Sequence, residues 1–540
     1  MIQTWDKTSP FVREGLKLKS LMVGLLALIS SMEWGRAEVV DIPDRSLERS
    51  LKSALQLPLD ADVTVDALEG LTELNLGGSR ISEITGLSHA VNLRRLDLSD
   101  NRLGDLVMPE AWSRLTEFLL GGNRIQSILL PEGYTNLFTA DLNSNQLREI
   151  SLPSSWTKLR TLRVQFNLLR RLDVPSGLDR LEEISASANQ LREITFPEKV
   201  NVINSLWLDR NQFRTIELPE SMPSLYRVFL ESNELAEVTL PQHAPQLTWL
   251  YLHSNHLKHV ELSESLNALR FIELSNNQFS EIDFPSSLPE LESLMLNQND
   301  LKFFELSEGM KSVVQLNLSD NQLTDLVFPK VLEELEELQV QNNQLQELVL
   351  PENTRSLKVL DARNNQLQRV VLPTRNRALS VLKLSRNDLR EFVIPDNLTG
   401  LQDVQLANNR LRSIVLSPAT TRLNSLNLSW NELESVTLPS GLTRLRNLNV
   451  SKNPIKQIYV PFGMDISSLK ITGVSEDAIQ VVVPLHVEFD GTEVELSWEV
   501  GVLQSRSSVS TGDWDAVDGA VSPYRVDLSE PQRFFRVIGK

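Results

Sequence analysis

The chain has 540 residues, 41% of them hydrophobic, and a formal net charge of −18. A chain of this size and composition can bury a large core, which argues against disorder, and its acidity argues against binding to nucleic acid or anionic lipid. Cysteine is absent, so disulfides, zinc–thiolate sites and cysteine nucleophiles are excluded.

Residues 1–37 have the pattern of a secretory signal peptide. Basic residues between positions 13 and 19 precede an apolar run over 21–29, and small residues lead to a cleavage site near Ala37. The apolar run is too short to cross a bilayer as a helix, although a non-cleaved anchor is the alternative. We therefore predict a secreted, cell-surface or envelope protein with no transmembrane segment after cleavage.

Residues 38–70 predict a helical N-terminal cap. Pro43 and Asp44 are suitable helix starters, and Pro58 ends the run. A second short helix is expected after Thr64, whose hydroxyl can cap it. The apolar face of the first helix is predicted to contain Leu47, Leu51, Ala54 and Leu55.

From Leu71 the chain repeats the pattern LxxLxLxxNxLxxIxLPxxLxx every 22 residues, through eighteen units in one register. A decayed last unit follows, so the repeat region is expected to span 71–475. This pattern resembles the leucine-rich-repeat family. The helical cap before it is similar to that of internalin-like bacterial members. Animal extracellular members usually carry disulfide-bonded caps, so the resemblance, together with the absence of cysteine, points to a bacterial protein.

Each unit contains an LxL alternation, which predicts a short strand with its leucines pointing inward. A proline usually follows the second apolar pass, and because proline cannot donate to a ladder this arm should be extended rather than helical. Stacked units bury the apolar sides that one unit leaves open. The predicted fold is a leucine-rich-repeat solenoid, α/β in the broad sense. It has a parallel β-sheet on the concave face and short extended or turn segments on the convex face.

The ninth position of the repeat is asparagine in seventeen of the eighteen units. The asparagine amide is both a donor and an acceptor, so it can satisfy backbone groups that no ladder reaches where the strand turns outward. We interpret this column as structural and not catalytic. Its members are Asn101, Asn123, Asn145, Asn167, Asn189, Asn211, Asn233, Asn255, Asn277, Asn299, Asn321, Asn343, Asn365, Asn387, Asn409, Asn431 and Asn453.

Residues 476–540 lack the repeat and contain β-type runs separated by turn signals such as Asp490-Gly491. Their motifs resemble a small C-terminal module of exported planctomycete and verrucomicrobial proteins. These motifs are Leu503–Ser505, Trp514, Gly519–Tyr524 and Arg533–Arg536. We expect a small all-β, sandwich-like unit. The resemblance carries no activity over to it, and a surface-retention or spacer domain and a C-terminal cap are the alternative roles. Its predicted core consists of Trp498, Trp514, Tyr524, Phe534 and Phe535.

Large and charged side chains gather at the predicted concave strand positions of units seven to eleven. Neighbouring strands would hold them about 5 Å apart, and exposed aromatic groups with arginine and acidic neighbours are typical of binding hot spots. The alternative is an aromatic ladder that only stabilises the sheet surface. Arg163 and Phe166 extend the set. The predicted ligand-binding residues are Trp207, Arg227, Phe229, Glu231, Trp249, Tyr251, His253, Phe271, Glu273 and Met295.

No catalytic, cofactor or metal site is predicted. His253, His256 and His259 have a metal-like spacing, but they cross the turn at Asn255 and should diverge. No nucleophile-elbow, phosphate-loop or calcium-loop string appears, so we do not expect an enzyme.

The predicted function is recognition of a macromolecule, foremost a protein, by the concave face. One alternative is a glycan-binding adhesin or polysaccharide receptor that uses the same aromatic residues. A second is a structural surface protein without a specific ligand. Fold alone does not decide between these functions, and the oligomeric state stays open.

Overall fold

The computed structural model describes residues 38–197, 199–489, 493–498, 501–507, 513–526 and 533–539. The predicted signal peptide and the Asp490-Gly491 turn lie outside these residues. The chain divides into two units, Met1–Leu266 and Asn267–Lys540, and each is described by itself.

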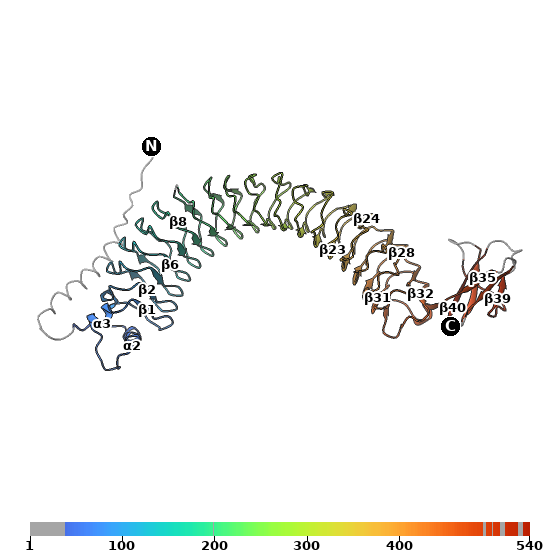
Figure 1. Ribbon diagram of the computed structural model, residues 1–540, viewed down its shortest axis with the longest axis horizontal. Helices are drawn as coiled ribbons and strands as arrows, with labels where there is room; N and C mark the ends of the chain where they lie inside the picture. Colours follow the sequence, from blue (N-terminus) through green and yellow to red (C-terminus); the bar gives the residue numbers. More distant parts are fainter. Residues whose placement is uncertain are drawn as a thin grey trace. The chain divides into compact units, whose positions relative to one another are not determined.

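The first unit begins with the predicted helical cap beside the first repeat strand (Figure 1). Helix α2 (Arg45–Ala54) starts where the Asp44 carboxylate accepts from backbone N–H groups, and α3 (Val65–Glu69) follows Thr64, as expected. Leu47 and Leu51 are fully buried. Ala54, however, is exposed, and Lys52 is buried instead. Its ammonium group reaches the Leu59 carbonyl oxygen, at 2.9 Å, so the buried charge keeps a partner.

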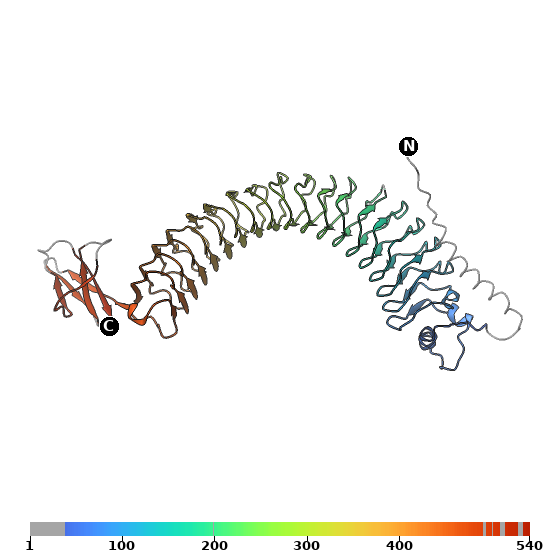
Figure 2. The same cartoon turned by 180° about the vertical axis from the view of Figure 1, so that it is seen from behind.

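The LxL segments form short parallel strands, here called main strands, and the central residue is buried in all of them but the last. Partners are 22 residues apart, for example Glu73 with Arg95. Figures 1 and 2 show these strands side by side from opposite directions. In the first unit they are β1 (Glu73–Asn75), β2 (Arg95–Asp97), β4 (Glu117–Leu119), β6 (Thr139–Asp141), β7 (Thr161–Arg163), β9 (Glu183–Ser185), β11 (Ser205–Trp207), β13 (Arg227–Phe229) and β15 (Trp249–Tyr251).

The second unit continues the same construction. Its last main strand pairs Asn447 with Lys470, a spacing of 23 residues, as the repeat decays. The main strands are β16 (Phe271–Glu273), β17 (Ser293–Met295), β19 (Gln315–Asn317), β21 (Glu337–Gln339), β23 (Val359–Asp361), β25 (Val381–Lys383), β27 (Asp403–Gln405), β29 (Ser425–Asn427), β31 (Asn447–Asn449) and β33 (Lys470–Thr472).

The second apolar pass of most units is extended, as predicted, and forms second strands that pair in small parallel sheets. One short 3-10 helix, η1 (Leu87–His89), interrupts this pattern in the first repeat. The second strands are β3 (Leu106–Val107), β5 (Ile128–Leu129), β8 (Arg171–Asp173), β10 (Glu193–Thr195), β12 (Thr215–Glu217) and β14 (Glu237–Thr239) in the first unit. In the second unit they are β18 (Phe303–Glu305), β20 (Asp325–Val327), β22 (Glu347–Val349), β24 (Arg369–Val371), β26 (Glu391–Val393), β28 (Ser413–Val415), β30 (Ser435–Thr437) and β32 (Gln457–Pro461).

Asparagine side chains link consecutive repeats. The Asn101 carbonyl oxygen accepts from the Ile81 N–H at 2.9 Å, and its amide nitrogen lies 2.9 Å from the carbonyl oxygens of both Leu76 and Leu98. The same three contacts recur at Asn211, with Leu191, Ala186 and Leu208. Each such side chain therefore satisfies backbone groups of its own unit and of the unit before it.

The residue before each of these asparagines has a left-handed backbone, from Asp100 (φ 55°) to Lys452 (φ 60°). Most of these residues are not glycine, and they include Phe166 (φ 56°) and Trp430 (φ 57°). Nothing in the consensus pattern points to this conformation, because the residue type at this position varies.

The C-terminal region is all-β, as predicted. Short helix η2 (Glu476–Ala478) leads into strands β34 (Ile479–Val483), β35 (His486–Phe489), β36 (Val494–Ser497), β37 (Val502–Arg506), β38 (Asp515–Ala516), β39 (Tyr524–Val526) and β40 (Phe534–Gly539). One sheet has the order β30-β32-β34-β40-β37-β38, and the other β35-β36-β39. The first sheet thus continues the second strands of the repeats, since β34 pairs in parallel with β32.

The core of this region differs in part from the prediction. Trp498 is buried with Val483, Leu496, Leu503 and Val537, and Tyr524 and Phe535 pack against this cluster. Trp514 and Phe534 are not part of it. Trp514 instead stacks between two arginine side chains at the sheet surface, where its ring is covered without entering the core.

Candidate functional site

The main strands of the first unit place most of the predicted site residues side by side. Trp207 pairs in register with Phe229, and Phe229 pairs with Tyr251. Arg227 and Trp249 are register partners two positions earlier on the same strands. The side chains of this row alternate with buried residues along each strand and are half-buried. We call the set Trp207, Arg227, Phe229, Glu231, Trp249, Tyr251 and His253 the aromatic patch.

The rings of the aromatic patch form one ladder, which crosses from strand to strand at Trp207, Phe229 and Tyr251 and runs along the chain from Trp249 to His253. The Trp207 and Phe229 centroids are 4.1 Å apart with planes inclined by 13°, and those of Phe229 and Tyr251 are 5.0 Å apart at 36°. Trp249 stacks on Tyr251 at 6.2 Å, and His253 meets Tyr251 edge-on at 6.4 Å. The ladder is therefore continuous from Trp207 to His253, and Trp207 and Phe229 each cover one face of the other.

Arg227 is held against this ladder by its neighbours. Its guanidinium carbon lies 5.9 Å from the Trp207 centroid and 5.2 Å from that of Tyr226. These distances are within the range of cation–π attraction. The buried Arg227 Nε has no hydrogen-bond acceptor among the described residues, and the contacts that hold this cation are with the two aromatic rings.

Acidic groups border the patch and are engaged by neighbours. Ser187 donates a hydrogen bond to the Asp209 carboxylate, which is buried, and Arg210 approaches the same carboxylate at 3.9 Å. Charges of both signs thus surround an apolar centre, as in a binding surface.

The two residues that extend the predicted set lie farther along the sheet. Arg163 pairs in register with Ser185, which separates it from Trp207, and its Nε is 3.6 Å from Glu183. Phe166 is 53% exposed. The structure therefore brings neither of them into the ring ladder.

Phe271, Glu273 and Met295 belong to the second unit and are described within it. Glu273 and Met295 are register partners on β16 and β17, and Phe271 pairs with Ser293. The three side chains are half-buried on their strands. The Arg270 guanidinium lies 5.9 Å from the Phe271 ring, and the Glu273 carboxylate accepts from the Ser275 N–H at 3.2 Å.

His253, His256 and His259, which were predicted to diverge at the Asn255 turn, lie within the described residues. His253 lies on the aromatic patch with Nδ1 3.1 Å from the Ser254 hydroxyl oxygen, whereas His256 and His259 are exposed beyond the turn. Within the described ranges, no three histidine, aspartate or glutamate side chains are grouped as a metal site would require. No helix in that part of the chain combines the length and apolar character of a membrane span.

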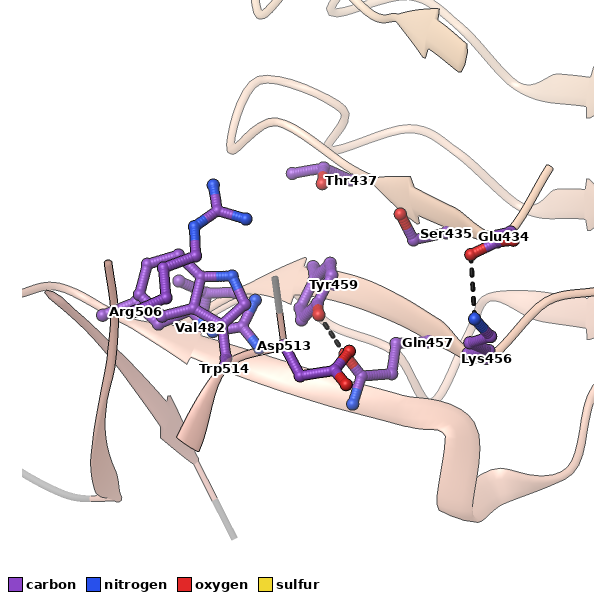
Figure 3. Close-up of a pocket in the computed structure, with 11 residues that line it drawn as sticks. Glu434, Ser435, Thr437, Lys456, Gln457, Tyr459, Val482, Arg506, Asp513 and Trp514 are labelled. Carbon is purple, nitrogen blue, oxygen red and sulfur yellow. Dashed lines mark hydrogen bonds and ion pairs between the residues drawn. The ribbon is translucent and has the colours of Figure 1, made fainter. Parts of the chain in front are cut away.

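A second candidate site lies where β30 and β32 of the repeats meet the C-terminal strands (Figure 3). It is an open cleft of about 830 Å³. The repeat side contributes Glu434, Ser435, Thr437, Lys456, Gln457 and Tyr459, and the C-terminal side contributes Val482, Arg506, Asp513, Trp514 and Arg536. We call it the junction cleft.

The junction cleft was not predicted from the sequence. Trp514 and Arg533–Arg536 were identified only as motifs of the C-terminal module, and Tyr459 was not singled out. Their meeting depends on the pairing of β32 with β34 and of β34 with β40. A tyrosine on a second strand where most units carry a smaller or charged residue is the one local signal that could have pointed to this place.

Comparison with known proteins gives a consistent picture of the repeats. The model of the "BspA type Leucine rich repeat region" matches residues 118–233, 165–272, 249–363 and 363–470, and a general leucine-rich-repeat model matches 92–115. No curated protein sequence matches the chain.

Solved structures share the fold at low sequence identity. YopM from Yersinia enterocolitica WA-314 aligns at 24% identity and a TM-score of 0.55, covering 84% of this chain and 99% of YopM. The functional domain of InlJ from Listeria monocytogenes aligns at 18% identity and a TM-score of 0.53, covering 87% of this chain and 96% of that domain. The InlJ domain includes a cysteine ladder, whereas this chain has no cysteine.

Proposed function

Because the chain belongs to the BspA-type leucine-rich-repeat family, we propose that it is an exported, non-enzymatic recognition protein whose aromatic patch binds a protein partner. The observation that carries this proposal is the stacked ladder from Trp207 through Phe229 to Tyr251 with Arg227 fixed beside it. Tryptophan, tyrosine and arginine are the residue types most enriched in binding hot spots.

The ladder is also pre-organised. The side chains pack on one another before a partner arrives, so little rotamer freedom remains to be lost when it binds. In an interface, apolar ring surface supplies affinity while bordering charges supply orientation. We assign this bordering role to Asp209, Arg210 and Glu231.

The ring geometry favours a protein over a glycan at this place. A sugar ring needs an open aromatic face on which to stack, but Trp207 and Phe229 lie almost parallel at 4.1 Å and cover each other. Side chains of a protein can pack against ring edges as well as faces. A glycan partner remains the alternative for the outer rings of the patch, and a structural role without a ligand is the second alternative.

The test compares three purified proteins that begin after the proposed signal peptide. The first is unchanged, the second carries Trp207→Ala, Trp249→Ala and Tyr251→Ala, and the matched control carries alanine at Asn317, Gln339 and Gln405. The control positions are also on main strands but lie outside the aromatic patch. Circular dichroism and thermal unfolding establish that all three are folded.

Each protein is then used to capture partners from envelope and environmental extracts, with and without neutral and charged sugars as competitors. A protein captured by the unchanged and control chains, but not by the patch variant, supports the proposal. If a sugar competitor abolishes capture, the ligand of the aromatic patch is a glycan and not a protein. Equal capture by all three proteins would move the binding site elsewhere, and capture of nothing would favour the structural role.

A further inference from the structure

The junction cleft contains a four-layer stack of aromatic and guanidinium groups. The Arg536 guanidinium carbon is 4.4 Å from the ring centroid of Tyr459 and 4.4 Å from that of Trp514. Arg506 lies 4.4 Å from the same Trp514 ring. Tyr459, Arg536, Trp514 and Arg506 therefore alternate, and both arginines line the same cleft. Figure 3 shows Arg506, Trp514 and Tyr459 in this cleft.

The positive charge of Arg536 is not neutralised by any residue that the structure describes. Its Nε donates to the Gln504 side-chain oxygen at 2.9 Å. No ion pair joins it to a carboxylate within the described ranges. Stacking covers the faces of the guanidinium and leaves its in-plane N–H groups as the donors for a ligand. In a chain with a net charge of −18, a cation left without a carboxylate needs an explanation, because acidic side chains are plentiful.

One acidic residue of the cleft, Glu434, is paired with a third cation. Lys456 lies 2.9 Å from the Glu434 carboxylate. The hydrogen bond and charge of Glu434, and then the charge of Asp513, raise the pKa of Lys456. Glu434 thus belongs to the Lys456 side of the cleft, whereas Arg506 and Arg536 line the C-terminal side.

Uncharged polar groups make up much of the remaining surface. Ser435 and Thr437 are exposed on β30, and the Tyr459 hydroxyl donates to the Gln457 side-chain oxygen on β32. Hydroxyl groups can both donate and accept. The cleft volume of about 830 Å³ lies in the range of small-ligand sites.

We infer that the junction cleft binds an acidic oligosaccharide, whose carboxylate or sulfate group lies at Arg536, while Arg506 adds positive charge to the same wall of the cleft. A planar guanidinium matches the geometry of either anion and forms charge-assisted hydrogen bonds with it. The sugar hydroxyls would meet Ser435, Thr437 and Gln457 and donate to Glu434 and Asp513. An acidic peptide fits less well, because it brings few hydroxyl groups for each carboxylate.

This inference is independent of the aromatic patch. The proposed patch lies in the first unit, whereas all lining residues of the junction cleft lie in the second. A variant that removes the binding side chains of one site can therefore leave the other site unchanged.

The test is isothermal titration of the full chain at low ionic strength with four probes. These are a galacturonic acid trisaccharide, a sulfated trisaccharide, a neutral galactose trisaccharide and a triglutamate peptide. We expect binding of one or both acidic sugars, and at most weak binding of the neutral sugar and the peptide. The carboxylated and sulfated arms identify which anion is preferred.

The variants separate binding from folding. Arg506→Gln and Arg536→Gln should each weaken acidic-sugar binding by about tenfold or more. The charge-matched control Arg525→Gln should leave binding unchanged, because Arg525 pairs with Glu493 and Glu495 outside the cleft. The double variant Ser435→Ala, Thr437→Ala changes exposed hydroxyls outside the stack, so it should weaken binding without lowering the melting temperature.

Three outcomes would overturn the inference. One is the absence of heat with both acidic sugars at millimolar concentration. Another is equal affinity for the acidic and neutral sugars. The last is binding that survives both arginine substitutions while the melting temperature falls, which would make the stack a structural clamp between the repeats and the C-terminal strands.

Discussion

Asp44 and Ser82 join the helical cap to the first repeat. One carboxylate oxygen of Asp44 lies 2.6 Å from the Ser82 backbone nitrogen and 2.7 Å from its hydroxyl oxygen. The other oxygen caps helix α2 by accepting from the N–H groups of Ser46 and Leu47. One buried side chain thus starts a helix and docks it on the repeats.

These contacts predict a dependence of stability on pH. Burial raises the pKa of Asp44, but the hydrogen bonds from Ser82, Leu47 and Ser46 outweigh it and lower the pKa from 3.8 to about 2. Because the folded pKa is depressed, the stabilisation is present above the pKa of the unfolded chain and is lost as pH falls through that of the folded protein. A shift of this size corresponds to about 2 kcal/mol.

Asp44→Asn should therefore lower the free energy of unfolding by about 2 kcal/mol at neutral pH. The difference from the unchanged protein should shrink between about pH 4 and about pH 2. Urea unfolding at both ends of this range measures it. A difference that stays constant with pH would mean that the charge of Asp44 is not what docks the cap.

The asparagine column predicts a position-dependent cost of substitution. Asn211→Ala leaves the Leu191 N–H and two carbonyl groups without their partners in a buried place. We expect a loss of about 2–3 kcal/mol in the free energy of unfolding.

The matched control for this substitution is Asn453→Ala. Asn453 makes the equivalent contact to Leu433 at 3.0 Å, but it is only half-buried, so water can reach the site and replace part of what is lost. Its cost should be smaller, about 1 kcal/mol. Denaturant unfolding of the two variants measures the loss in the free energy of unfolding, and hydrogen exchange at the Leu191 amide shows whether this N–H has lost its partner. Equal losses for Asn211→Ala and Asn453→Ala would contradict the role assigned to burial.

The left-handed residues predict a stabilising substitution. Phe166 has φ 56° and is 53% exposed. Burial of its ring therefore contributes little stability to offset the strained backbone. Asparagine tolerates this conformation better than phenylalanine, and a β-branched residue tolerates it worse. Phe166→Asn should raise the free energy of unfolding by about 0.5–1 kcal/mol and Phe166→Val should lower it. Thermal unfolding measures both variants. If both change the free energy of unfolding in the same direction, loss of the phenylalanine side chain and not backbone strain determines the effect.

The close approach of repeats predicts an intolerant glycine. A Cβ atom at Gly441 would lie 1.7 Å from the Pro418 carbonyl oxygen of the preceding repeat, whereas one at Gly104 would meet nothing. Gly441→Ala should therefore lower the free energy of unfolding by about 1–3 kcal/mol, the range for overpacking. Gly104→Ala should have little effect, and thermal unfolding of the two variants side by side tests this difference.

Much of the fold could be read from the sequence because it is local and repeated. The LxL alternation determines which residues of each strand are buried, and the 22-residue period determines which residues become register partners, such as Trp207 and Phe229. The Asp44 and Thr64 caps follow from side chains within a few positions of the helices that they start. The period alone is therefore enough to place neighbouring positions on neighbouring strands.

Other features depended on the tertiary structure, since they depend on rotamers or on pairing between distant segments. The period brought Trp207 and Phe229 together, but only side-chain packing determined that their rings cover each other. The sequence predicts Trp514 in a core, yet β34 and β40 extend the sheet of the repeats and leave this ring between Arg506 and Arg536. The sequence by itself determined the repeat, its register and its asparagine column, because a one-dimensional stack is specified unit by unit. Only the tertiary structure determined where the junction cleft forms, because the strand pairing beyond the last repeat does not follow the 22-residue period and cannot be predicted from it.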